Sequence, residues 1–440
     1  MSEWKEVRLG DVCEIVGGGT PSTKKDEYWN GDISWLTPKD LSNYDKKYIY
    51  RGERSITQEG LEKSSAKLLP KGTILFTSRA PIGYVAIAGK EVCTNQGFKS
   101  LICKDKAYNQ FIYYVMKFKT DDIIKVATGS TFKEISGNGL KSIKIHLPPL
   151  LTQKKIADIL SVIDEKIETL QNINSTLEEM AKTIFKSWFV DFDITKAKVS
   201  GKSDDEIAKE FGINREIIQL FPSEFETSEI GEIPKGWEVR KINEISNIGI
   251  GKTPPRKEKE CFTTNKNDIK WVSIKDMGNS NMFIFNTNEY LTKEAIKKYN
   301  IKIVPKNSVL LSFKLTLGRV SITSEEMVTN EAIAHFIIDN NSITSTEYIY
   351  LYLKTFNFDK LGNTSSIARA VNSKVVKNIP ILISDNIIIK IFNKITAPIF
   401  QNIENNTQQI QTLQQTRDTL LPKLINKEIE VDELDIRGIE

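Results

Sequence analysis

The chain has 440 residues, of which 40% are hydrophobic and 27% charged, and its formal net charge is +4. This length exceeds what one hydrophobic core usually supports, so two or three domains are expected. It contains no run of eighteen or more apolar residues and does not start like a signal peptide, which argues against a membrane protein or a secreted one. The cysteines form no CxxC pair and are typical of buried thiols in a reducing compartment, so a cytoplasmic location is expected; they are Cys13, Cys93, Cys103 and Cys261.

The sequence repeats itself once. The segment that opens at Trp4 returns at Trp237, and the GGTP motif at 18–21 returns as GKTP at 251–254. The same register relates 31–41 to 267–277, 69–87 to 304–322, and 143–148 to 379–384. Two diverged copies of one domain indicate that the molecule performs a similar task twice.

Residues 1–150 are expected to form the first globular domain, a mixture of short strands, turns and a few helices. Residues 71–89 place apolar and β-branched residues on both sides of a glycine-containing turn, which predicts a β-hairpin. Residues 108–124 have the apolar spacing of a helix, and its aromatic face is expected in the core rather than as a platform for stacked bases. Two prolines close this domain, and Thr152 is predicted to cap the helix that follows.

Residues 151–190 are predicted to form a long central helix. Its apolar residues recur at alternating steps of four and three, which is the pattern of a coiled-coil seam. The seam positions are Ile156, Leu160, Ile163, Ile167, Leu170, Asn174, Leu177, Ala181 and Ile184.

An acidic linker at 191–236 leads to the second globular domain, expected at 237–386. In this domain residues 306–323 predict a hairpin and residues 346–361 an aromatic helix, matching the two elements of the first domain.

Residues 387–426 are predicted to form a C-terminal helix with nearly the same heptad rhythm, followed by an acidic tail at 427–440. Pro398 lies inside the pattern and is expected to kink or restart this helix near its beginning. The seam positions are Ile399, Ile403, Asn406, Ile410, Leu413, Leu420 and Leu424.

Two such seams in one chain are most simply explained if they bury one another as an antiparallel pair. The alternative, in which each helix lies on its own globular neighbour, suits a two-in-seven apolar stripe less well. The expected fold class is therefore α+β, with two tandem pseudo-repeated α/β domains separated by two long helices that form an antiparallel coiled coil.

The small net charge hides an uneven distribution. Residues 1–150 hold 23 basic and 17 acidic residues and residues 237–386 hold 21 and 15, so each globule has an excess of six positive charges. The segment from 191 to 233 is acidic, with 5 basic and 11 acidic residues. An excess of basic residues on both globules is compatible with phosphate contact, although ordinary solvated surfaces also carry such an excess.

The sequence offers little for catalysis. His146 and His335 lie in apolar, strand-like runs without a second ligand at metal-binding spacing, so both are interpreted as structural residues with satisfied hydrogen bonds. GIGKT at 249–253 lacks the first glycine of a phosphate-binding loop, and no GxSxG or HExxH motif occurs. We expect no catalytic residue, no metal site and no enzymatic activity in this chain by itself.

Three segments carry a resemblance to a known family. AKTIFKSWFVDFDITKAK at 181–198, FPSEFETSEIGEIPKGWEV at 221–239 and LLPKLINKEIEV at 420–431 resemble the conserved regions of type I restriction-modification specificity subunits. The repeated pattern of an opening tryptophan, then I-x-W, PKG-x-(I/V)-L and T-N-(Q/E), resembles their target-recognition domains. The likeness covers essentially the whole chain. One departure is PKN at 305–307, where the first copy has PKG, and it affects only a local turn.

This resemblance implies a subunit that binds double-stranded DNA at an asymmetric bipartite site, each target-recognition domain contacting one half. The two helices are expected to form the coiled coil between the domains and to dock the modification subunits, two of them. It further implies that S-adenosylmethionine belongs to those methyltransferase subunits, and ATP and magnesium to a restriction subunit that translocates and cleaves DNA. No cofactor is expected in this chain. Asn174 and Asn406 are expected either to meet one another, to contact a modification subunit, or to face solvent.

Basic and hydroxyl residues in the expected loops are the candidates for DNA contact, although each is equally well an exposed surface residue. Arginine can bind guanine through two hydrogen bonds whereas lysine more often holds phosphate, so the arginines are the better candidates for reading bases. Asp40 and Asp276 are expected to cap local turns rather than to contact cytosine. The first-domain candidates are Lys24, Lys25, Lys39, Arg79, Ser130, Thr131 and Lys133, and those of the second domain are Lys252, Arg256, Lys257, Lys275, Lys314, Arg319, Arg369 and Lys374.

Two other classes of function remain open at this point. One is a module that binds RNA or a protein partner and dimerises through its coiled coil. The other is a nuclease or methyltransferase that acts alone, which the missing motifs disfavour.

Overall fold

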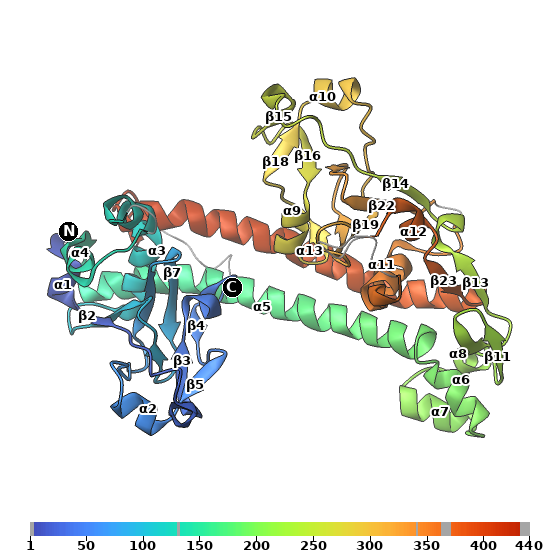
Figure 1. The fold of residues 1–440 in the computed structure, drawn as a ribbon, viewed down its shortest axis with the longest axis horizontal. Coiled ribbons are helices and arrows are strands. Elements are labelled where there is room, and N and C mark those ends of the chain that lie inside the picture. The colour runs from blue at the N-terminus through green and yellow to red at the C-terminus, as the bar shows by residue number, and fades with distance from the viewer. Residues whose placement is uncertain (1–3, 130–132, 340–341, 362–370, 432–440) are drawn as a thin grey trace. The chain divides into compact units, whose positions relative to one another are not determined.

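A computed structural model describes residues 4–129, 133–339, 342–361 and 371–431 (Figure 1). The chain divides into two compact units, one formed by residues 1–170 with 410–440 and the other by residues 171–409. Two helices of 40 residues each, α5 (Leu150–Phe189) and α13 (Asn386–Ile425), contribute to both units. Each unit therefore holds one globular domain together with part of each long helix.

The first globule is the part of the chain before α5. Its strands are β1 (Lys5–Arg8), β2 (Cys13–Gly17), β3 (Trp29–Leu36), β4 (Tyr48–Ile49), β5 (Arg54–Ile56), β6 (Ile74–Ser78), β7 (Ile82–Ala88), β8 (Cys93–Thr94), β9 (Lys99–Cys103) and β10 (Lys144–Leu147). Its helices are α1 (Leu9–Val12), α2 (Gln58–Glu62), α3 (Asn109–Val126) and α4 (Gly137–Ser142). One sheet has the order β2-β9-β6-β7-β4, a smaller one the order β5-β3-β8, and β1 pairs with β10. The antiparallel pair of β6 and β7 confirms the hairpin predicted there.

The second globule repeats this plan between β13 and β23. Its strands are β13 (Glu238–Lys241), β14 (Asn247–Ile250), β15 (Phe262–Thr263), β16 (Ile269–Val272), β17 (Phe283–Ile284), β18 (Glu289–Leu291), β19 (Val309–Ser312), β20 (Val320–Thr323), β21 (Val328–Thr329), β22 (Ile333–Ile337) and β23 (Pro380–Ile383). Its helices are α9 (Ile274–Asn279), α10 (Lys293–Lys298), α11 (Thr346–Thr355) and α12 (Ser373–Lys377). The larger sheet has the order β14-β22-β19-β20-β17, the smaller one β15-β18-β16-β21, and β13 pairs with β23. The strand orders of the two larger sheets correspond one to one, which confirms the repeat seen in the sequence.

The aromatic faces of α3 and α11 lie in the two cores. Tyr113 and Tyr114 of α3 and Tyr348 and Tyr350 of α11 are almost completely buried. The prediction that these rings belong to the core is therefore confirmed. The thiols of the four cysteines are free, and three of the four cysteines are buried.

In the first unit, the start of α5 packs against the end of α13. Ile156 and Leu160 share a core cluster with Leu421 and Leu424. The next turns of α5 form a second cluster with Ile410, against which Leu413 and Leu420 are packed; its α5 members are Ile163, Ile167 and Leu170. Because early residues of one helix meet late residues of the other, the pair is antiparallel. The same cluster that holds Ile156 also contains residues of α3, so the helix lies on its own globule as well as against the other helix, and the two alternatives are not exclusive.

In the second unit, the end of α5 packs against the start of α13. Phe185 of α5 meets Phe392 of α13 at 5.8 Å between ring centroids, in the cluster that also contains Ala181 and Ile403. The half-buried seam residues Leu177, Ile184 and Ile399 pack against this cluster. One polar layer interrupts the apolar seam: Asn406 Nδ2 donates to Asn174 Oδ1 at 2.9 Å, and Asn174 Nδ2 donates to Thr407 Oγ1 at 3.2 Å. The two asparagines therefore meet one another.

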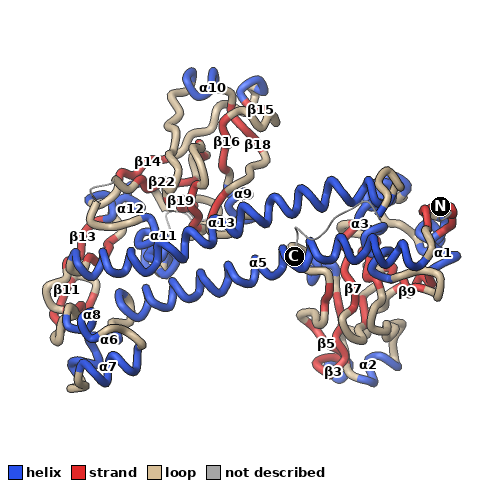
Figure 2. The backbone as a smooth tube through the Cα atoms, turned by 180° about the vertical axis from the view of Figure 1, so that it is seen from behind, coloured by secondary structure: helices blue, strands red, loops and turns tan. Residues whose placement is uncertain are grey.

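The cap predicted at Thr152 and the restart predicted at Pro398 are both wrong. The helix begins at Leu150, where the Gln153 amide already donates to the Pro149 carbonyl, so Thr152 lies in the first turn and does not cap it. Pro398 does not restart α13, which Figure 2 shows as an unbroken helix. Phe392 and Phe400 on either side of it are buried in the core, and this packing outweighs the hydrogen bond that the proline cannot make.

The acidic segment expected as a linker is folded. It forms α6 (Asp193–Val199), α7 (Asp204–Phe211), α8 (Arg215–Gln219) and a hairpin of β11 (Phe225–Ser228) with β12 (Gly231–Pro234). Ile194, Ile207, Ile218 and Ile233 join the core of the second unit. Across the described part of the chain, no helix combines the length and apolar character needed to cross a membrane.

Candidate nucleic-acid interface

One short loop joins three parts of the first globule. We call residues 94–97 the TN loop and residues 18–25 the TP loop. The TN loop binds the TP loop through the Gly19 amide, which donates to the Thr94 carbonyl at 2.8 Å. It binds the end of β6 through the Ser78 amide, which donates to the Gly97 carbonyl at 2.7 Å, and its Asn95 amide donates to the carbonyl of Leu36 at the end of β3. The TP loop, the turn after β3 and the β6–β7 hairpin thus meet at one place.

The second globule has the same junction. Its TN loop is 329–332 and its TP loop is 251–258. Lys252 donates to the Thr329 carbonyl at 2.8 Å, Phe313 donates to the Ala332 carbonyl at 2.9 Å, and Asn330 donates to the Val272 carbonyl at 3.0 Å, all through backbone amides. The same backbone hydrogen bonds recur in both globules together with the shared Gly-x-Thr-Pro and Thr-Asn residues, which indicates that the arrangement of the loops matters to both copies.

The junction explains the Gly-x-Thr-Pro motif. The Thr20 hydroxyl bonds to the Gln96 side chain, and the Thr253 hydroxyl bonds to the Glu331 side chain. A Cβ on Gly18 would lie 2.0 Å from the Asn95 carbonyl oxygen, and a Cβ on Gly251 would lie 2.2 Å from the carbonyl oxygen of Asn330. Only glycine allows the two loops to approach this closely.

The turns after β3 and β16 are fixed by carboxylates. Asp40 accepts hydrogen bonds from the backbone amide and hydroxyl of Thr37, at 2.7 and 2.8 Å. Asp276 accepts the corresponding bonds from Ser273, at 2.8 and 2.6 Å. The expectation that both aspartates cap local turns is confirmed, and their oxygens are occupied.

The tips of the two hairpins carry strained residues at matching positions. Ala80 has φ 48° and Leu315 has φ 63°, in the left-handed region that non-glycine residues rarely adopt. The Leu315 side chain is 74% exposed. The PKG turn and its PKN counterpart also match, because Asn307 adopts φ 61° where Gly72 has φ 90°. Asparagine tolerates this region, so the departure at 305–307 leaves the turn intact.

In the first globule, the candidate residues lie around this junction but several have partners. Lys39 pairs with Glu53 at 2.8 Å. Arg79 lies 3.6 Å from Glu134, beside the exposed Lys133. Lys25 donates to the Tyr28 hydroxyl at 3.1 Å, whereas exposed Lys24 has no partner among the described residues. Ser130 and Thr131 lie outside the described residues.

In the second globule, the two described arginine candidates are engaged within the protein. Arg256 forms a two-point ion pair with Glu289, and Arg319 donates to the Ile274 carbonyl at 2.6 Å. Lys252 donates to the Tyr299 carbonyl at 2.6 Å. The remaining described candidates are exposed and have no acidic partner among the described residues: Lys257, Lys275, Lys314 and Lys374. Arg369 lies outside the described residues.

Sequence reasoning missed Arg54. It is exposed on β5, and its guanidinium carbon lies 3.6 Å from the centroid of the Trp29 ring. The signal was weak, because no aromatic residue lies next to Arg54 in its short strand. Its contact with Trp29, 25 residues earlier in the chain, depends on the pairing of two strands. Only the register of β3 and β5, which places Trp35 opposite Arg54, makes the contact visible.

The interpretation of His335 is wrong in one respect. His335 is buried as expected, but neither ring nitrogen has a hydrogen-bond partner in the described structure. Burial lowers its pKa to about 4, so the ring is neutral at pH 7. His146, in contrast, lies exposed on β10.

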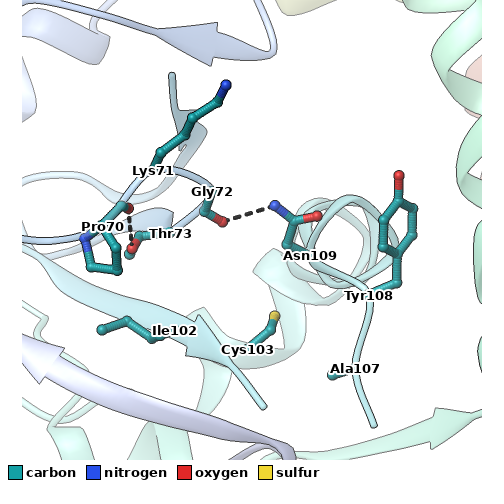
Figure 3. A pocket seen from close by; sticks show the side chains of 9 residues that line it. All are labelled: Pro70, Lys71, Gly72, Thr73, Ile102, Cys103, Ala107, Tyr108 and Asn109. Carbon is teal, nitrogen blue, oxygen red and sulfur yellow. Dashed lines mark hydrogen bonds between the residues drawn. The ribbon is translucent and has the colours of Figure 1, made fainter. Parts of the chain in front are cut away.

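A polar hollow of about 240 Å³ lies at the PKG turn of the first globule (Figure 3). Asn109 at the start of α3 points to the turn and donates to the Gly72 carbonyl at 3.0 Å, and the Thr73 hydroxyl donates to the Pro70 carbonyl at 2.7 Å. The bond from Asn109 attaches α3 to the turn before β6, and the bond from Thr73 closes the turn itself. The amide of Asn109 and the hydroxyl of Thr73 are therefore used within the protein rather than offered to a ligand.

Comparison with known proteins identifies the family. The model of the type I restriction modification DNA specificity domain matches residues 1–179 and 234–415. The specificity subunit of the type I restriction enzyme MjaIX from Methanocaldococcus jannaschii is 35% identical, over 98% of this chain and 95% of its own length. That of the HindI enzyme from Haemophilus influenzae is 28% identical, over 98% of this chain and 100% of its own.

A solved structure shows the same fold. The S subunit of a type I restriction-modification system from M. genitalium aligns with a TM-score of 0.56 over 96% of both chains, at 16% sequence identity. Both halves of the chain match one family model, in agreement with the duplicated loop junction and the paired long helices. The chain belongs to the family of type I restriction-modification specificity subunits.

Proposed function

We propose that this chain determines the DNA sequence recognised by a type I restriction-modification complex, with each globule contacting one half of a bipartite site. The observation that carries the proposal is the duplicated junction of TP loop, TN loop and hairpin. Two copies of one surface fit two similar targets, and their different side chains fit different bases. The site is therefore asymmetric.

The dimensions of the elements suit this task. Half-sites on the same face of B-DNA lie about 34 Å apart, one helical turn. A helix of 40 residues is about 60 Å long, at ~1.5 Å per residue, and so is long enough to connect domains that contact successive turns.

The chemistry belongs to the partners in this proposal. Two modification subunits dock on the paired helices and transfer methyl groups from S-adenosylmethionine. A restriction subunit uses ATP and magnesium to translocate and cleave DNA. The chain itself supplies positions and contacts and carries out no reaction.

Sequencing the methylated bases of cells with and without this gene tests the proposal. One bipartite motif is expected to be methylated in cells with the gene and unmethylated in cells without it. An unchanged methylation pattern in a strain that expresses the partner subunits would contradict it.

An exchange of residues 1–150 for the matching domain of a relative tests the assignment of one half-site to each globule. One half of the motif is expected to change and the other to stay. A simultaneous change of both halves would contradict the assignment.

A further inference from the structure

The smaller sheet of the first globule presents an arginine on a pair of tryptophans. Trp29 and Trp35 meet edge to face, with 5.0 Å between ring centroids. The Arg54 guanidinium carbon lies 3.6 Å from the Trp29 centroid and 5.4 Å from that of Trp35. A planar guanidinium over an aromatic face is held in orientation while its N–H groups stay available at the edges.

The second globule has the same arrangement. Phe262 and Trp271 meet edge to face, with 5.8 Å between centroids. The guanidinium carbon of Arg256 lies 4.3 Å from the Phe262 centroid and 4.6 Å from that of Trp271.

The two arginines come from different places in the fold. In the first globule Trp35 pairs with Arg54 across β3 and β5. At the matching register of the second globule, Trp271 pairs with Glu289 across β16 and β18. The guanidinium there comes instead from Arg256 of the TP loop. The two globules therefore place a guanidinium on the aromatic pair from two different segments of the fold.

The two guanidinium groups differ in what they can still bind. Arg256 donates through both terminal nitrogens to Glu289, at 2.7 and 3.0 Å. Arg54 is exposed, and within the described ranges no carboxylate lies at ion-pair distance from it. The first globule thus offers an oriented set of free donors, and the second offers a guanidinium whose donors are already used.

The aromatic pair also anchors the TP loop. The Trp29 indole N–H donates to the Ser22 carbonyl at 3.1 Å, and the Trp35 indole N–H donates to the Gly19 carbonyl at 2.9 Å. Arg54 therefore lies beside the loop junction that both globules share.

We propose that Arg54 is a specificity-determining residue that binds the O6 and N7 atoms of a guanine in the half-site of the first globule. This inference rests on the proposed function. Guanine presents two acceptors in the major groove at the spacing of a guanidinium fork. The second globule does not read guanine at the corresponding place, because Glu289 occupies the fork of Arg256.

The test uses the full chain assembled with its modification subunits. Arg54→Gln removes the charge and the fork, and Arg54→Lys keeps the charge but removes the fork. The matched control is Arg51→Gln. Arg51 lies three residues before Arg54, carries the same charge, is exposed and stacks on no described ring. The readouts are the methylated motif and the affinity for motif variants at several salt concentrations.

Both Arg54 variants are expected to lose discrimination at one guanine of one half-site by about 5- to 150-fold, and to keep the other half-site. Arg54→Lys should keep the wild-type dependence on salt. Arg51→Gln should keep the motif. Uniform weakening on all sequences by Arg54→Gln would make Arg54 a phosphate contact and overturn the inference, as would an unchanged motif. The absence of any bipartite motif in the wild type would overturn the proposed function itself.

Glu289→Gln tests the second globule independently. Release of Arg256 should steepen the dependence of log affinity on log salt by up to about 0.9, the effect of one added phosphate contact. An unchanged slope together with an unchanged motif would contradict the claim that Glu289 withholds Arg256 from DNA.

Discussion

Val16 on β2 lies directly opposite Ser100 on β9, whereas the matching positions of the second globule hold Gly249 and His335. All four residues are buried. A Cβ on Gly249 would lie 1.9 Å from the His335 Nε2 atom. A large and a small side chain have thus exchanged places between the copies, so that the filled volume between the strands is conserved.

Gly249 and His335 should be replaceable by the valine and serine of the first globule only if both are changed together. Gly249→Val alone forces the side chain into the imidazole and should lower the free energy of unfolding by about 1–3 kcal/mol. The double variant Gly249→Val, His335→Ser recreates the pair of the first globule and should recover most of the loss. Urea unfolding of wild type, both single variants and the double variant measures the coupling. Additive losses would show that the two side chains do not compete for the same space.

His335 should also make stability depend on pH. Its pKa is about 4 in the folded protein against an ordinary value of 6.5, so the unfolded chain binds the proton first as the pH falls. The contribution of His335 to the free energy of unfolding is fully present above pH 6.5 and decreases as the pH falls from 6.5 to 4. Below pH 4 it no longer changes, and the total loss is at most about 3 kcal/mol. The difference between wild type and His335→Ser in unfolding experiments across this range isolates the effect from that of the carboxylates. Parallel pH curves would mean that the imidazole reaches water.

At the scale of elements, the polar layer of Asn174, Asn406 and Thr407 is the exception within an apolar seam. Its hydrogen bonds at 2.9 and 3.2 Å form only when the two helices are in one register. A shift by one heptad would leave an amide opposite a leucine or isoleucine. Buried asparagines in coiled coils fix register at a cost in stability.

Replacement of both asparagines by leucine should therefore raise the melting temperature and allow alternative helix registers. Asn174→Leu alone should destabilise, because it leaves the Asn406 amide without its partner. Thermal unfolding followed by circular dichroism gives the stability, and disulfide trapping between cysteines introduced into the two helices reports the register. A melting temperature that does not change in the double variant would argue against burial of this layer.

Local patterns were sufficient to predict the hairpins, the aromatic helices and both long helices, because alternation and heptad spacing act within a few turns. Pro398 shows the limit: a rule about one residue was overruled by the burial of Phe392 and Phe400 around it. The loop junction could not be predicted, because it consists of backbone hydrogen bonds between segments far apart in the chain. For the same reason the sequence did not reveal that Glu289 forms an ion pair with Arg256, which lies 33 positions earlier.

At the scale of the whole molecule, the excess of six positive charges on each globule predicts salt-dependent binding. Neutralising several phosphates releases counterions, so affinity for duplex DNA should fall steeply between 50 and 200 mM salt, by about 10³- to 10⁵-fold for 6–10 contacts. Titration of labelled cognate DNA at several salt concentrations measures this slope. An affinity that does not depend on salt would argue against the basic loops as the contact surface.

The paired helices should also act as a ruler for the spacer of the motif. One heptad added after Gln171 and another after Gln408 keeps the seam and lengthens each helix by about 10 Å. If the helices set the separation of the globules, the preferred spacer grows by roughly three base pairs at ~3.4 Å each, and both half-sites stay the same. The extra spacer rotates one half-site by roughly a quarter turn, on about ten base pairs per turn, so activity should drop. Methylation by an active variant at the original spacing would contradict the ruler.

The way the long helices are shared between units has a genetic consequence. Leu421, Leu424 and Ile425, near the end of α13, belong to the same core as Leu9 and Phe111 of the first globule. A nonsense codon or frameshift shortly before codon 421 therefore removes part of the core of the domain that is translated first. Such an allele should behave like a lesion at the opposite end of the reading frame, with loss of recognition by the amino-terminal domain rather than by the domain closest to the mutation.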